Sequence, residues 1–192
     1  MRRPELSFPV LLKWWVDQNA KGRHVWPGNY LDKVTGTPTG WDAQELLDQI
    51  SATRAQAGAT GNVFFSMRSF MFGRDNLPEK LVAGPYGEKA LVPASPWLDS
   101  VPPLAPIVRV GRDASTGANT VSLQPQGAEP VWLWVLRTRV GTDWTTDVIP
   151  GLQRFVTIPR PVIGAPDELA VSAVDRSGNE STLVLTGLST TP

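Results

Sequence analysis

Apolar residues in the first part of the chain recur at helical spacing in three places. The segment Pro9–Val16 forms an apolar stripe with a proline in its first turn, where helices tolerate this residue. Asp42, followed three positions later by Glu45, has the spacing of a capping box and predicts the start of a second helix. Residues 75–83 predict a third, shorter helix.

Two runs between these helices have the length of strands. Residues 23–26 predict a short strand that is broken by Pro27 and Gly28. Residues 62–66 form a continuous apolar run, which is typical of a strand buried on both faces in a parallel sheet covered by helices. The order helix, strand, helix, strand therefore predicts βα units.

The pattern changes at Ala90, where prolines become frequent. The stretch 91–106 contains five prolines, and no helix can run through it, so it predicts a semi-rigid linker or a strap across a surface. We place a domain boundary near Asp99. The expected organisation is a barrel segment at 1–98, a proline-rich linker at 99–106 and a β-sandwich at 107–192.

The remaining residues predict short strands only. These segments are rich in β-branched residues and are separated by Gly, Pro, Asn and Asp, as a β-sandwich requires. The expected strands are 107–111, 120–124, 131–139, 154–158, 168–175 and 182–186. Residues 175–181 predict the hairpin turn between the last two of them.

Composition excludes several classes of function. The chain has 18 Lys and Arg against 18 Asp and Glu, and it has no cluster of basic residues that would hold a nucleic acid or an anionic membrane. It contains no cysteine and a single histidine, His24, so disulfides and Cys/His zinc sites are excluded. No apolar stretch has the length of a membrane span, and no cofactor is expected.

Several motifs occur together in a fixed order. They are LKWWVD at 12–17, PGNY at 27–30, Trp41 ahead of the Asp42 helix, GNVFFS at 61–66 and ALVPASPWLD at 90–99. This combination resembles the C-terminal third of the glycosyl-hydrolase-like family 10 proteins. Residues 173–181 in turn resemble the closing hairpin of a fibronectin-III-like domain, which often follows the barrel in that family.

The resemblance implies a TIM-like barrel with a glycoside hydrolase activity, and an extracellular or cell-envelope location, although the chain itself shows no signal peptide. A complete barrel takes about 250 residues and eight strands. The present sequence predicts two such strands, which the resemblance identifies as the seventh and eighth. The fold class expected is therefore the last two βα units of a TIM-like barrel followed by a fibronectin-III or immunoglobulin-like sandwich.

The sequence offers no pair of catalytic carboxylates near the predicted strand ends. Glycoside hydrolysis normally uses two such groups, held at the C-terminal ends of barrel strands. After the first predicted strand the only acid is Asp32, and after the second none occurs before Asp75. We therefore assign no catalytic residue and expect the chain by itself to be catalytically incomplete.

The predicted strand ends do carry polar and aromatic side chains that suit a sugar. Asn29 and Tyr30 follow the first strand, Ser66 and Arg68 follow the second, and Trp26 lies within the first. Amide, phenol, hydroxyl and guanidinium groups are the donors and acceptors that a hydroxyl-rich ligand requires. These five residues are the candidate substrate-binding set, and ordinary loop or core structure is the alternative for each. His24, at the start of its strand, is assigned a structural role.

Trp132 and Trp134 lie on the same face of one predicted strand, because side chains alternate with a period of two. They could form a platform that stacks on sugar, or they could belong to the sandwich core or to an interdomain contact. The structural alternative is favoured, since large apolar patches are seldom left exposed.

Three classes of function remain open. The first is the C-terminal part of a glycoside hydrolase that acts on a polysaccharide or a cell-envelope glycan. The second is a non-catalytic carbohydrate-binding module carried by the sandwich, and the third is a structural interaction module. Carbohydrate is the expected ligand. Because two barrel strands alone leave open edges, the chain is also expected to self-associate or to need a separate barrel segment.

Overall fold

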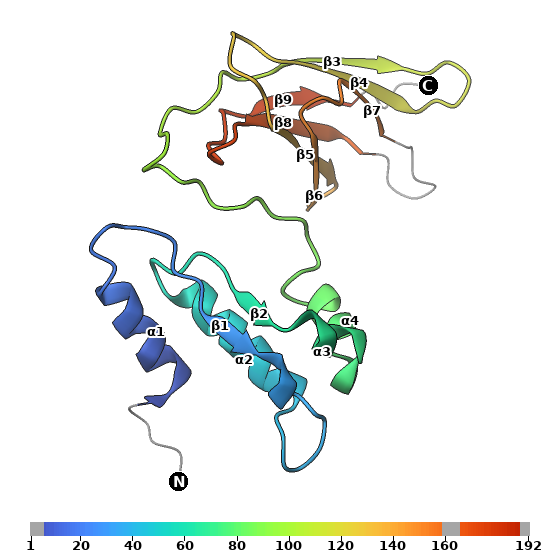
Figure 1. Cartoon of the computed structure of the whole chain (residues 1–192). Coiled ribbons are helices and arrows are strands. Elements are labelled where there is room, and N and C mark those ends of the chain that lie inside the picture. The colour runs from blue at the N-terminus through green and yellow to red at the C-terminus, as the bar shows by residue number, and fades with distance from the viewer. Residues whose placement is uncertain (1–5, 159–165, 189–192) are drawn as a thin grey trace. The chain divides into compact units, whose positions relative to one another are not determined.

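The computed structural model describes residues 6–158 and 166–188 and divides the chain into two compact units, Met1–Glu88 and Lys89–Pro192 (Figure 1). The first unit holds all the α-helices of these residues, and the second holds a β-sandwich. Within the described residues, no helix has the length and apolarity needed to cross a membrane.

The first unit contains the three predicted helices and one more. They are α1 (Phe8–Asp17), α2 (Ala43–Ala55), α3 (Met67–Met71) and α4 (Leu77–Ala83), with the short 3-10 turns η2 (Leu31–Lys33) and η3 (Arg74–Asn76). The capping box is confirmed at its first bond, because the Asp42 carboxylate accepts the Glu45 amide at 3.0 Å. Helix α3 has only five residues, which is too short for a helical period to appear in the sequence.

The two strands of this unit pair in parallel, as predicted. Strand β1 (Gly28–Tyr30) lies beside β2 (Val63–Phe65), with Asn29 opposite Phe64. The strand predicted at 23–26 is wrong, since Val25 makes only an isolated bridge to Ala59. The strand lies instead at 28–30, where the sequence predicted a break. Pro27 offers its carbonyl to the amide of Val63 at 3.0 Å, and a proline at an open edge forfeits no ladder bond.

Helices cover one face of this small sheet. Phe64 points to that face and packs against the core under α2 and α4, where Phe70 meets it edge to face at 5.5 Å between ring centroids. The buried core side chains are Leu31, Val34, Ala43, Leu46, Ile50, Leu77 and Leu81. Alternation along a strand sends the neighbours of Phe64 to the opposite face.

The opposite face of the sheet is exposed, contrary to the prediction of a strand buried on both sides. Tyr30, Val63 and Phe65 lie on it with 44%, 48% and 64% of their surface accessible. The apolar run at 62–66 has the composition of a doubly covered strand, yet the described residues provide a cover on one side only.

The second unit is a sandwich of two antiparallel sheets. One sheet has the order β3-β4-β7 and the other β6-β5-β8-β9. The strands are β3 (Ile107–Arg112), β4 (Asn119–Gln124), β5 (Leu133–Val140), β6 (Asp143–Pro150), β7 (Phe155–Ile158), β8 (Glu168–Val174) and β9 (Val184–Gly187). This three-plus-four arrangement confirms the all-β sandwich of fibronectin-III-like type.

Strand β6 was not predicted. It lies at the edge of the four-stranded sheet and, among the described strands, pairs only with β5. Its sequence contains two aspartates and ends in Pro150, residues that are unfavourable in strands but common on edges, where they prevent further pairing. The sequence did not predict this strand because an edge strand tolerates residues that a central strand does not.

The proline-rich segment belongs to the second unit as a strap. The amide of Ser95 donates to the carbonyl of Ser177 at 2.7 Å, and the Asn179 side chain donates to the carbonyl of Asp99 at 3.1 Å. Ser177 and Asn179 both lie in the turn after β8, which is the hairpin predicted at 175–181. The unit therefore begins at Lys89, ahead of the boundary expected near Asp99.

Candidate functional site

The C-terminal ends of β1 and β2 lie side by side, because the strands are parallel (Figure 1). This places Tyr30, Ser66 and Arg68 at one edge of the sheet, as a βα architecture requires. The peptide bond between Phe65 and Ser66 is cis. We call this edge the strand mouth, and it is the candidate site that the sequence points to.

Asn29 is within β1 and not after it, and its side chain is completely buried. Its amide nitrogen donates to Gln49 Oε1 of α2 at 2.9 Å, and its oxygen accepts from Asn62 Nδ2 at 2.9 Å. Asn62 also donates to Thr53 Oγ1 at 3.1 Å. These side chains form a hydrogen-bonded network that connects the sheet to α2. The network satisfies the hydrogen-bonding groups of the buried Asn29 amide.

Tyr30 and Phe65 provide the aromatic part of the strand mouth. Their ring centroids are 6.1 Å apart, and the ammonium of Lys33 lies 6.0 Å from the Tyr30 ring. Both residues are exposed, Tyr30 by 44% and Phe65 by 64% of their surface. The arrangement offers flat apolar surface beside a cation, at the end of the sheet where a barrel binds its substrates.

Ser66 and Arg68 lie on the other side of the mouth. Ser66 is half-buried at the N-cap of α3, where its side chain makes no capping bond. Arg68 is exposed and lies with its guanidinium 5.2 Å from the centroid of the Phe72 ring. Both side chains therefore retain donor groups at the surface, in keeping with a polar ligand.

The two acids near the mouth have protein partners. Asp32 accepts a hydrogen bond from the hydroxyl of Ser69, a buried residue of α3. Asp75 accepts the amide of Ala43 at 2.6 Å and the ammonium of Lys80 at 3.0 Å, which hold the pKa of this carboxyl below its usual range. A carboxyl with a lowered pKa is a poor proton donor near neutral pH, so Asp75 does not suit the role of general acid.

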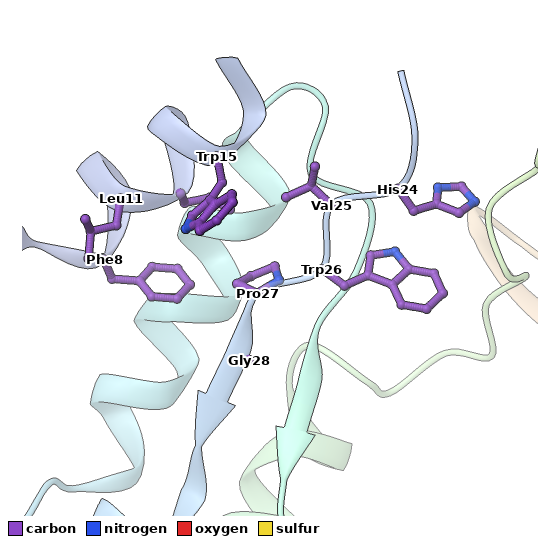
Figure 2. Close-up of a pocket in the computed structure, with 9 residues that line it drawn as sticks. Phe8, Leu11, Trp15, His24, Val25, Trp26, Pro27 and Gly28 are labelled. Atoms are coloured by element: carbon purple, nitrogen blue, oxygen red, sulfur yellow. The ribbon is translucent and has the colours of Figure 1, made fainter. Parts of the chain in front are cut away.

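A pocket of about 500 Å³ lies at the opposite end of β1 (Figure 2). It is formed between α1 and the chain leading into β1, and its lining residues are Phe8, Leu11, Leu12, Trp15, His24, Val25, Trp26, Pro27 and Gly28. Trp26, assigned to the candidate sugar-binding set, is therefore remote from the strand mouth. Sequence reading did not identify this pocket, because α1 contributes to it from outside the predicted strands.

Polar contacts fix the aromatic side of the pocket. The indole N–H of Trp26 donates to Thr60 Oγ1 at 2.8 Å, and the same hydroxyl lies 3.0 Å from His24 Nδ1. The rings of His24 and Trp26 are stacked with centroids 5.4 Å apart. His24 thus has a structural partner on either side, consistent with the role assigned to it.

The two tryptophans of the sandwich occupy different environments, contrary to the common strand face expected from the sequence. Trp134 is completely buried in the core between the sheets, and its indole N–H donates to the carbonyl of Gly151 at 3.1 Å. Trp132 precedes β5 and has 49% of its surface accessible, with the guanidinium of Arg176 at 4.5 Å from its ring. Only Trp132 therefore presents a ring that a ligand could reach.

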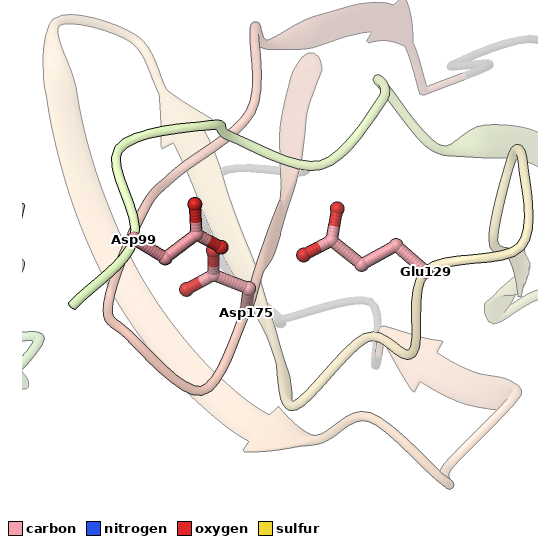
Figure 3. A group of neighbouring side chains, drawn as sticks. All are labelled: Asp99, Glu129 and Asp175. Carbon is pink, nitrogen blue, oxygen red and sulfur yellow. The ribbon is translucent and has the colours of Figure 1, made fainter.

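Three carboxylates gather beside the turn after β8. Oxygen atoms of Asp99, Glu129 and Asp175 lie within 4.8 Å of one another (Figure 3). Asp175 is buried and accepts the amides of Ser177 and Asn179 at 2.7 and 2.9 Å, as well as the Asn179 side chain at 2.8 Å. Through these hydrogen bonds, Asp175 stabilises the turn after β8.

Comparison with known proteins gives one relative by sequence. No family model matches the chain. The "Glycosyl hydrolase YngK" of Bacillus subtilis (strain 168) is 29% identical over 104 residues, which are 52% of this chain and 20% of that protein. The chain thus spans about a fifth of the length of this relative.

Solved structures resemble about half of the chain. The fn3 domain of human collagen alpha-1(XX) chain is 20% identical with a TM-score of 0.36, covering 47% of this chain and 84% of that domain. The spore cortex lytic enzyme SleM of Clostridium perfringens is 17% identical with a TM-score of 0.35, covering 47% of this chain and 30% of that enzyme. The Endo-D glycoside hydrolase domain of Streptococcus pneumoniae R6 is 20% identical with a TM-score of 0.28, covering 47% and 15%.

Proposed function

We propose that this chain is part of a glycoside-hydrolase-related protein, in which the first unit supplies two βα units of a TIM-like barrel and the sandwich is an accessory domain. The sequence relationship to a glycosyl hydrolase supports the general class. The proposal includes a polysaccharide or cell-envelope glycan as substrate and an extracellular or envelope location, as the family resemblance implies.

The observation that carries the barrel proposal is the uncovered face of a parallel sheet. Parallel sheets occur almost only where both faces are covered, and a barrel covers the inner face with side chains from its other strands. Here helices cover the side of Phe64, while Tyr30, Val63 and Phe65 form an exposed apolar face. These three side chains have the composition of a barrel interior that lacks its neighbouring strands.

The strand mouth is the proposed substrate contact. Tyr30 and Phe65 offer aromatic surface, and Lys33 and Arg68 offer cationic donors at the C-terminal ends of the strands. Glycan hydroxyls are suited to such donors. Asn29 does not contact the substrate in this proposal. Its buried side chain bonds to Gln49 and Asn62 and fixes the position of β1 relative to α2.

Hydrolysis requires an acid and a second carboxylate across the scissile bond, and the strand mouth of this chain does not present them. Asp32 is bonded to Ser69, and Asp75 has a lowered pKa. The proposal therefore assigns the catalytic carboxylates to barrel strands other than β1 and β2. In this assignment the mouth holds sugar while other strands carry out the chemistry.

The test is an assay of the purified chain and its Asp32→Asn variant on a panel of aryl glycosides and polysaccharides. We expect no turnover by either protein. Turnover by the wild-type chain that disappears in Asp32→Asn would overturn the assignment of the catalytic acids to other strands. Asp48→Asn, which neutralises an exposed carboxylate on α2 outside the strand mouth, is the matched control.

A further inference from the structure

The helix α1 is apolar almost all round, yet most of it is exposed. Its sequence, FPVLLKWWVD, contains two charged residues, and its only fully buried side chain is Leu12. Val10, Leu11, Trp14 and Trp15 have between 43% and 61% of their surface accessible. A helix with apolar residues on nearly every side is normally buried, so this one is suited to a further contact.

The orientation of α1 on its unit is fixed. Leu12 packs inward, and a Cβ atom built at Gly58 would meet Val16 at 2.8 Å, so Val16 lies directly on the chain after α2. Leu11, Trp14 and Trp15 are neighbours because they are three and four positions apart, and Leu11 and Trp15 also line the pocket beside α1. Trp14 and Trp15 also contact each other edge to face, with centroids 4.9 Å apart. The outward apolar stripe is thus a fixed surface.

The two charges of α1 border this stripe. Lys13 and Asp17 are one turn apart, and their side chains pair at 2.7 Å while 64% and 52% exposed. If a second α1 lies antiparallel on the stripe about a twofold axis near Trp15, Lys13 of each helix comes beside Asp17 of the other. The surface is therefore complementary to itself in charge as well as in apolar character.

We propose that α1 is a homodimerisation surface, on which a second copy of this chain packs its own α1 in antiparallel orientation. Val10, Leu11, Trp14 and Trp15 form the apolar centre, and the Lys13 and Asp17 charges pair crosswise at its border. The zero formal net charge of the chain places no long-range repulsion between copies. This proposal concerns the chain itself and is independent of the proposed enzymatic role.

The first experiment measures mass by light scattering and sedimentation between about 1 and 100 µM, where a modest interface of this kind dissociates. We expect a monomer–dimer equilibrium in the wild-type chain. Trp14→Ser with Trp15→Ser should weaken it by about a hundredfold, because both indoles leave the interface. Both residues are exposed, and circular dichroism checks that the variant remains folded. A wild-type chain that is monomeric throughout would overturn the proposal.

The second experiment uses charge reversal to identify the crosswise pairing. Lys13→Glu makes the border of α1 entirely acidic, and Asp17→Lys makes it entirely basic. Each variant alone should dimerise about tenfold more weakly, and an equimolar mixture of the two should form heterodimers. The matched control is Lys89→Glu. It replaces the similarly exposed Lys89–Asp147 ion pair of the sandwich by two acids and should leave the dimer unchanged.

Two outcomes of the mixing experiment would contradict the proposal. One is a mixture that stays as weak as either variant alone, which would show that the border charges do not meet. The other is an equal effect of Lys89→Glu, which would place the contact on the sandwich. A dimer that persists in the Trp14→Ser, Trp15→Ser variant would instead locate association at another surface, such as the open edge of β1.

Discussion

Trp132 and Trp134 are two positions apart, yet their substitution should affect stability very differently because only Trp134 is buried. Trp134 fills the sandwich core, so Trp134→Ala should lower the free energy of unfolding by about 3–5 kcal/mol. Trp132→Ala removes an exposed ring and should cost less than about 1 kcal/mol. Urea unfolding followed by circular dichroism measures both.

The same pair of variants tests whether the sandwich binds carbohydrate. If Trp132 and Arg176 form a sugar contact, Trp132→Ala should lose retention on a glycan affinity column while its stability stays near that of the wild type. Equal retention by Trp132→Ala and the wild-type chain would exclude Trp132 from such a contact. Trp134→Phe is the control, because it changes a tryptophan that no ligand can reach.

Glu180 is expected to make the sandwich sensitive to acid. Burial alone would raise its pKa, but hydrogen bonds from Arg137 at 2.7 Å and Ser172 at 2.6 Å outweigh burial and lower it. A carboxyl whose pKa is lowered on folding stabilises the protein above its unfolded pKa, about 4.5 for Glu180, and this contribution disappears as the pH falls through the folded value. The stabilisation should therefore be complete at pH 7.

The prediction is tested by unfolding Glu180→Gln and the wild type with urea at pH 7 and at pH 3. The variant should be less stable by about 1 kcal/mol at pH 7, and the difference should shrink at pH 3. Glu79→Gln, a change at an exposed acid of the first unit, is the control. A difference between Glu180→Gln and wild type that grows toward pH 3 would contradict the assigned direction of the pKa shift.

At the scale of elements, α2 depends on two carboxylates at its first turn. Asp42 accepts the amide of Glu45, and Asp75 accepts the amide of Ala43, so two of the unpaired donors at this helix end are satisfied. Asp42→Ala should lower the stability of the first unit by about 1 kcal/mol. Asp42→Asn retains an acceptor and should restore most of the loss; equal destabilisation by both would rule out the cap as the cause.

At the scale of the whole molecule, the two units should unfold in separate transitions. The first unit has a two-stranded sheet of three residues per strand, while the second has two sheets around a continuous core. Small sheets with open edges are marginally stable, so the first unit should melt at the lower temperature. Differential scanning calorimetry of the chain should resolve two peaks.

Core substitutions assign those peaks. Leu46→Ala lies in the first core and should move only the lower transition, and Val121→Ala lies in the second and should move only the upper one. A single transition that both substitutions move together would mean that the units fold as one cooperative body, contrary to this prediction.

Several features follow from the sequence alone because they depend on a few neighbouring residues. The start of α2 requires only the Asp42 side chain and the amide three positions on. The turn after β8 is fixed by Asp175, which accepts the amides of Ser177 and Asn179. The parallel order of the first unit and the β-rich character of the second follow in the same way from the spacing of apolar residues.

Other features were decided only by tertiary structure, because they depend on which segments pair and on what covers them. Strand β1 begins at Gly28, directly after Pro27, because the Pro27 carbonyl accepts the amide of Val63 and the chain stays extended beside β2. Asn29 became a buried structural amide because α2 supplies Gln49 at hydrogen-bond distance. Period-two alternation places Tyr30 and Phe65 on one face, but the sequence pattern cannot reveal whether that face is covered. Burial is a property of neighbours distant in sequence, and so the exposed sheet face and the exposed stripe of α1 emerge only from the fold.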